Sequence, residues 1–242
     1  MKVIHCGDSF TLGVGCDKPE HSYAAQFSHH LGAPFVNLAK TGASSYVIYL
    51  QVMQAIQQQA SFVLINTTTP WRTEWIKEGH NPPQLSLFDV NYHEYNGDVG
   101  SPIQQDPRYN PILFSETITG LHEFKEGRTN NYARLKAEPL GKIQTIIDYF
   151  GSIQADPILE AQCSAMINLG CSALQRHGIP FVVLANRWCA SLAAVLDPAN
   201  FLAVDFIEVS HRWPDPYGTL HTSSHGHKVV FDQLAQHYHE HF

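Results

Sequence analysis

The stretch Lys2-Val3-Ile4-His5-Cys6-Gly7-Asp8-Ser9, at the start of the chain, decides the fold. Its first four residues predict a short β-strand that stops at Gly7. Four further extended segments follow along the chain, within residues 35–39, 62–65, 181–185 and 201–209. These segments are rich in Val, Ile and Leu without polar alternation, which is typical of strands that are buried on both faces. The sequence therefore predicts a parallel sheet covered by helices.

Helical patterns separate the predicted strands. Helices are expected over residues 22–31, 45–59 and 156–176, and from about residue 224 onward. The clearest of them has Asp156 as its N-cap and Pro157 at the first helical position, and it ends near Gly178. This alternation of strands and helices predicts an α/β fold, a three-layer αβα sandwich with a mostly parallel, flavodoxin-like sheet of about five strands.

One region interrupts this alternation. Residues 78–138 are rich in Asn, Pro, Gly, Gln and Tyr and show no sustained hydrophobic period. An irregular segment of that length inside a compact domain is usually functional or partly disordered. We therefore predict one domain over residues 1–242, with a long irregular insertion at about 78–138 that is a candidate lid.

The composition excludes several classes of protein. Lys and Arg number 15 against 22 Asp and Glu, which gives a net charge of −7, so no nucleic-acid partner is expected. No run approaches the roughly 20 apolar residues of a membrane helix, so no membrane partner is expected either. The N-terminus has no signal-peptide pattern, and the five scattered cysteines fit reduced thiols, which together predict a cytoplasmic location.

The carboxyl ends of the strands are where an open α/β sheet binds its ligands. Ser9 follows the first strand on a tight turn, where its hydroxyl can be exposed. A serine hydroxyl is a weak nucleophile until a base takes its proton. His221 lies just before the last predicted helix and would emerge at the same edge of the sheet. The predicted topology can therefore bring the two side chains together.

Three blocks of the sequence together resemble the SGNH (GDSL-like) hydrolase family. Gly7-Asp8-Ser9 matches the first block of the family, which carries the nucleophile. Residues 37–44 resemble the second block, whose glycine, here Gly42, donates a backbone N–H to the oxyanion hole. His221, followed by Gly226-His227, resembles the last block, in which the first histidine is the general base. The blocks occur in the family's order and span nearly the whole chain.

This resemblance implies a serine esterase or acyl hydrolase that cleaves a small ester or an O-acyl (acetyl) group, such as one on a carbohydrate. Ser9 would attack the ester carbonyl as His221 takes its proton, and the backbone N–H groups of Ser9 and Gly42 would hold the oxyanion. The expected partner is a small-molecule or carbohydrate ester, and no cofactor is expected.

The sequence departs from the family at two places. The third block is usually Gly-x-Asn-Asp, whereas the third strand here runs into a polar segment in which either Asn66 or Thr68 is the candidate third oxyanion donor. The family commonly has Asp three residues before the base, and that position is Gly218. Either Asp215, six residues before His221, orients the imidazole, or a backbone carbonyl does so and the site is a dyad.

The candidate substrate-binding residues are Asp8, Arg72 and Arg187. The two arginines follow the third and fourth strands, where they would contact an anionic or sugar substrate or merely form surface ion pairs.

Two other functions stay open. One is a ligand- or carbohydrate-binding protein that has the same fold but impaired catalysis, because the aspartate that the family has three residues before the base is missing. The other is a metal-dependent hydrolase that uses His221, His225 and His227, although no acidic cluster lies nearby and we expect no metal site.

Overall fold

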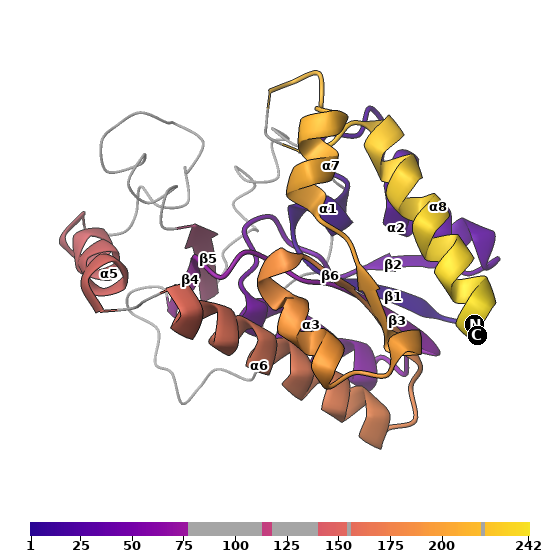
Figure 1. Ribbon diagram of the computed structural model, residues 1–242, viewed down its shortest axis with the longest axis horizontal. Helices are drawn as coiled ribbons and strands as arrows, with labels where there is room; N and C mark the ends of the chain where they lie inside the picture. The colour runs from indigo at the N-terminus through magenta and orange to yellow at the C-terminus, as the bar shows by residue number, and fades with distance from the viewer. Residues whose placement is uncertain (77–112, 118–139, 154–155, 219–220) are drawn as a thin grey trace.

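A five-stranded sheet forms the centre of the computed structural model, which describes residues 1–76, 113–117, 140–153, 156–218 and 221–242 (Figure 1). In spatial order its strands are β2 (Phe35–Asn37), β1 (Val3–Cys6), β3 (Phe62–Asn66), β6 (Phe181–Ala185) and β7 (Phe201–Ala203). All neighbouring strands are parallel. Counted within this sheet alone, the order is the 2-1-3-4-5 of flavodoxin-like folds. The predicted fold class is confirmed.

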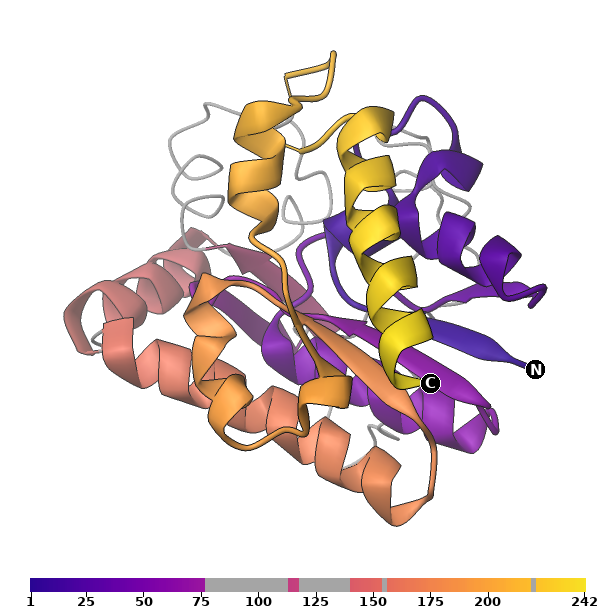
Figure 2. The same ribbon diagram turned by 45° about the vertical axis from the view of Figure 1, so that its right-hand side comes forward.

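Helices cover both faces of the sheet. On one face α3 (Ser45–Gln57) packs against α6 (Asp156–Arg176), and on the other α2 (Tyr23–His30) packs against α8 (Ser224–His241) (Figures 1 and 2). α7 (Phe206–Arg212) contacts α8, and α5 (Leu140–Ile153) precedes α6. No helix in the described ranges is long and apolar enough to cross a membrane.

The core explains why the strands lack polar alternation. Every residue of β1, β3 and β6 is buried, because successive side chains point to opposite faces and a helix pair covers each face. On β3, for example, Val63 and Ile65 join the cluster under α3 and α6, whereas Phe62 and Leu64 join the cluster under α2 and α8. The central strands are thus held in register by apolar packing on both sides.

The structure refines the predicted elements. β2 ends at Asn37, two residues before the predicted end, and β7 ends at Ala203. The carboxylate of Asp205 then caps α7, a helix that the sequence analysis did not predict, by accepting the backbone N–H groups of Ile207 and Glu208 at 3.0 and 3.2 Å.

The predicted insertion is described only in part. β5 (Leu113–Thr117) lies within it and pairs antiparallel with β4 (Arg72–Ile76), which follows β3. At least this segment is therefore regular rather than irregular. Residues 77–112 and 118–139 lie outside the described residues, so the predicted lid stays a prediction.

Two buried histidines connect outer helices to the rest of the fold. His5 on β1 hydrogen-bonds through Nε2 with the Ser28 hydroxyl of α2 at 2.7 Å. His227 on α8 accepts the backbone N–H of Tyr23 at Nδ1 and stacks on the Tyr23 ring. Burial lowers the pKa of His5 to about 3 and that of His227 to about 4.

Acidification is therefore expected to destabilise the fold. Both pKa values lie below 6.5, the value of an unperturbed histidine, so between pH 6.5 and pH 4 the unfolded chain binds protons that the folded chain excludes. Each group should lower the free energy of unfolding by about 1.4 kcal/mol per pH unit over that window. Urea unfolding at pH 7 and pH 5 measures the loss. His227→Gln should reduce the pH dependence and the exposed His177→Gln should not; equal dependence in the two variants would contradict this account.

Candidate active site

Two hydrogen bonds to the side-chain amide of Gln51 fix the turn that carries Ser9. Gly7 donates its N–H to Oε1 of Gln51 at 2.6 Å, and Nε2 of Gln51 donates to the Gly7 carbonyl at 3.1 Å. A Cβ on Gly7 would lie 2.2 Å from Oγ1 of Thr11, so no larger residue fits. Ser9 then begins the short helix α1 (Ser9–Leu12). Gln51 was not among the predicted site residues, because nothing in the helical pattern around it marks a buried glutamine as a partner of a distant turn.

The structure brings His221 to Ser9. Nε2 of His221 lies 2.8 Å from Oγ of Ser9, although the two residues are 212 positions apart. The ring of Phe10 packs beside the imidazole, with 4.9 Å between the two ring centroids. The predicted meeting of these two side chains is confirmed, and their roles in a reaction stay predictions.

Asp215 organises the loop that carries His221. Its buried carboxylate accepts the backbone N–H of His221 at Oδ2 (3.1 Å) and that of Tyr217 at Oδ1 (2.7 Å). Its own N–H donates to the His221 carbonyl at 3.0 Å. The loop thus bends so that Asp215 lies beside His221, as one of the two predicted alternatives requires. That the carboxylate orients the imidazole stays a prediction.

The candidate oxyanion donors surround the same turn. Gly42 lies buried between β2 and α3 with a φ of +76°, a conformation that favours glycine. Asn66 ends β3, and its Nδ2 donates to Oδ1 of Asp8 at 3.1 Å. Oγ1 of Thr68 donates to Oδ2 of Asp8 at 3.2 Å. Both alternatives for the third donor are therefore hydrogen-bonded to the residue before Ser9, and the choice between them stays a prediction.

Arg72 also contacts Asp8. Its NH1 lies 3.0 Å from Oδ2 of Asp8 and donates to the Ala43 carbonyl at 2.9 Å. The side chains of Arg72 and Asp8 are only 10% and 4% exposed. In the structure these two candidate substrate-binding residues therefore form an ion pair with each other.

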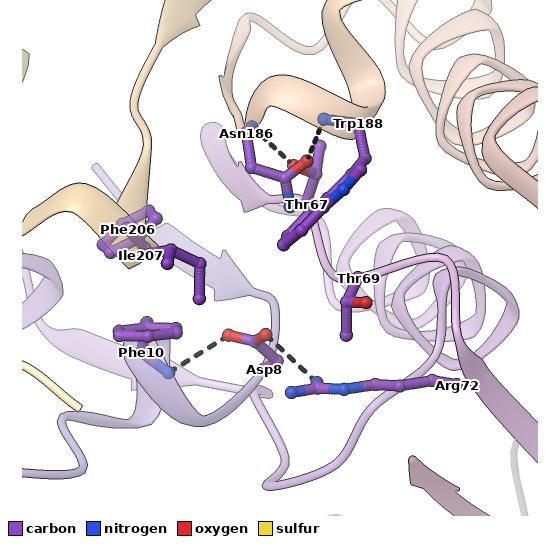
Figure 3. A pocket seen from close by; sticks show the side chains of 9 residues that line it. All are labelled: Asp8, Phe10, Thr67, Thr69, Arg72, Asn186, Trp188, Phe206 and Ile207. Atoms are coloured by element: carbon purple, nitrogen blue, oxygen red, sulfur yellow. Dashed lines mark hydrogen bonds and ion pairs between the residues drawn. The ribbon is translucent and has the colours of Figure 1, made fainter. Parts of the chain in front are cut away.

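A small cavity of about 60 Å³ opens beside this ion pair (Figure 3). Its lining residues come from the segments that follow β1, β3 and β6, from the start of β4 and from α7: Asp8, Phe10, Thr67, Thr69, Arg72, Asn186, Trp188, Phe206 and Ile207. Apolar side chains form its walls, and polar groups stand between them. This position matches the ligand-binding edge expected for an open α/β sheet.

Arg187 does not line this cavity. It begins the 3₁₀ helix η5 (Arg187–Ala194), its side chain is 59% exposed, and its NH1 is 3.8 Å from Oδ2 of Asp205. Its guanidinium stacks over the Trp188 ring at 4.9 Å. These contacts fit the surface ion pair that the sequence analysis left open.

The three histidines of the metal hypothesis do not converge. Nε2 of His221 faces Ser9, whereas His227 is buried with Nε2 3.5 Å from the Val14 carbonyl. His225 is exposed and packs edge-on against Trp213. Among the residues that the structure describes, no group of three or more His, Cys, Asp or Glu side chains is arranged to hold a metal ion.

A scan against protein-family models and a search of curated proteins found no match. Among solved structures, the chain is similar to a "putative lipolytic protein of G-D-S-L family" from Desulfitobacterium hafniense DCB-2, with 12% identity, a TM-score of 0.34 and 98% of each chain covered. It is also similar to a two-domain esterase active on acetylated mannans, with 12% identity and a TM-score of 0.36, over 99% of this chain and 49% of that one.

Proposed function

We propose that this chain is a serine-dependent acyl hydrolase of the SGNH type, which cleaves a small ester or an O-acyl group, such as an acetyl group on a carbohydrate. The observation that supports the proposal is the 2.8 Å contact between Oγ of Ser9 and Nε2 of His221, at the carboxyl edge of a parallel sheet. A hydroxyl and an imidazole at this distance are a nucleophile and a base within hydrogen-bond reach.

The reaction follows from that geometry. Nε2 of His221 takes the proton of the Ser9 hydroxyl as Oγ forms a bond to the ester carbonyl carbon. The backbone N–H groups of Ser9 and Gly42 hold the resulting oxyanion. Asn66 can be the third donor with the second hydrogen of its amide, whereas Thr68 can do so only by turning its single hydroxyl hydrogen away from Asp8. When the tetrahedral intermediate collapses, the alcohol leaves with the proton from His221. Water, deprotonated by the same imidazole, then releases the acyl group and restores Ser9.

The cavity supports a small substrate group. Its volume of about 60 Å³ and its walls from Phe10, Trp188, Phe206 and Ile207 suit a short apolar group better than a long chain. The pairing of Arg72 with Asp8 leaves little net charge at its edge. These features support a neutral ester over a strongly anionic substrate.

Covalent labelling tests the proposal. We expect the wild-type chain to hydrolyse p-nitrophenyl acetate and to be modified at Ser9 by a fluorophosphonate, with parallel loss of activity. Ser191→Ala, which removes an exposed serine outside the site, should retain both properties. Labelling by the fluorophosphonate at a residue other than Ser9 would contradict the proposed function. Binding of esters without turnover would also contradict it and would favour the ligand-binding alternative.

The role proposed for Asp215 predicts a second result. Asp215→Asn keeps the shape of the side chain but removes the charge that stabilises an imidazolium at His221, so kcat should fall at least about tenfold. Steady-state kinetics with p-nitrophenyl acetate measure the fall. The exposed Asp232→Asn on α8 is the matched control. An unchanged kcat in Asp215→Asn would identify the site as a dyad.

A further inference from the structure

We infer that the buried ion pair between Asp8 and Arg72 is a positioning device, which holds the oxyanion-binding loops against Ser9 and cancels the carboxylate charge beside the nucleophile. The inference rests on the proposed function and adds a task for two residues that line the cavity, which is to place the reacting groups.

Asp8 is the hub of this arrangement. Its carboxylate accepts hydrogen bonds from the Phe10 backbone N–H, from Nδ2 of Asn66, from Oγ1 of Thr68 and from NH1 of Arg72, at 3.0 to 3.2 Å. A buried carboxylate needs such donors to offset its loss of hydration. The donors come from α1, the end of β3, the segment after β3 and the start of β4. One side chain thus joins the turn of Ser9 to both candidate third oxyanion donors.

Arg72 extends the link to the second oxyanion loop. The same NH1 that contacts Asp8 also donates to the carbonyl of Ala43 at 2.9 Å, and Ala43 directly follows Gly42. This carbonyl belongs to the peptide between Ala43 and Ser44, so Arg72 anchors the chain one residue after Gly42, the proposed oxyanion donor. A guanidinium suits this task because its donors have fixed directions.

The opposite charges of Asp8 and Arg72 also affect the stability of the oxyanion. Asp8 immediately precedes the proposed nucleophile, so its negative charge opposes the formation of an oxyanion nearby. The opposite charge of Arg72, 3.0 Å away and only 10% exposed, compensates it. Removal of Arg72 alone should therefore harm the reaction more than removal of both charges.

Kinetics of four variants test the inference: Arg72→Gln, Asp8→Asn, the double variant, and the exposed Arg176→Gln as a matched control. Rates are expressed per active site, as titrated with the fluorophosphonate. We expect Arg72→Gln to lower kcat for p-nitrophenyl acetate about 10- to 100-fold with little change in KM, because it weakens oxyanion stabilisation. The double variant should turn over faster than Arg72→Gln alone, and Arg176→Gln should match the wild type.

Chemical rescue separates positioning from a merely structural role. Guanidinium ion, far below denaturing concentrations, should restore part of the kcat of Arg72→Ala, and urea at the same concentration should not. If Arg72→Gln fails to fold, Asp8→Asn carries the test. Asn keeps the shape of the side chain but has one accepting oxygen where the carboxylate has two, so it cannot hold Asn66, Thr68 and Arg72 together. If that loss of positioning outweighs the removal of the negative charge, kcat should fall with KM unchanged.

The outcomes distinguish this inference from the proposed function. Activity that survives the loss of Ser9 would overturn both. Loss of activity in Ser9→Ala, with kcat of Arg72→Gln and Asp8→Asn equal to that of Arg176→Gln, would overturn the positioning role alone. Additive effects in the double variant would overturn the charge compensation.

Discussion

Ser9→Ala is expected to lower kcat for p-nitrophenyl acetate by at least about 1,000-fold, as the loss of a single triad member does in serine hydrolases. The reason is that alanine offers no atom to form the acyl-enzyme, so that only water positioned by His221 and the oxyanion donors can react. Steady-state release of p-nitrophenol from purified protein measures the effect.

The fold should survive this substitution. The hydroxyl of Ser9 contacts His221, and the remaining contacts of the turn are made by its backbone and by Asp8. An unchanged melting temperature would show that the lost rate reflects chemistry rather than unfolding. If the variant retained the wild-type rate, Ser9 would not be the nucleophile, and another group would have to account for turnover.

Gly15→Ala is expected to lower kcat at least about 100-fold, because a misplacement of about 1 Å in the reacting groups costs that much. Gly15 has a φ of +94°, and a Cβ there would lie 2.4 Å from the Thr222 carbonyl oxygen. It would also lie 3.0 Å from Cβ of Asp215 and 3.2 Å from Cβ of His221. The loop that carries the imidazole would have to move away from Ser9.

Gly178→Ala is the matched control for this prediction. Gly178 also has a positive φ, of +64°, but a Cβ there would meet no atom within 4 Å. Both variants should lose some stability from the strained backbone, and only Gly15→Ala should lose the rate. Kinetics and melting temperatures of the two proteins measure the difference. Equal kcat values would mean that the loop of His221 tolerates the displacement.

The local sequence determined the sheet and the position of Ser9. Runs such as Phe62–Ile65 and Phe181–Ala185 carry apolar side chains on both faces, and this is only stable between two layers of helices. Gly7 breaks the first strand at a carboxyl edge, so Ser9 falls where such sheets bind ligands. α7 was missed because its cap, Asp205, and its first residues lie inside the range 201–209, in which only an extended segment was expected.

Tertiary structure decided how the site is held together. The contacts of Gln51 with Gly7, of Arg72 with Asp8 and Ala43, and of Gly15 with the Thr222 loop join segments that lie 29 to more than 200 residues apart. Local propensity reflects each residue's own backbone and its near neighbours, so it cannot specify which distant atom a buried amide, guanidinium or glycine will meet. Only the packed arrangement of β1, β3 and the C-terminal loop fixes those partners.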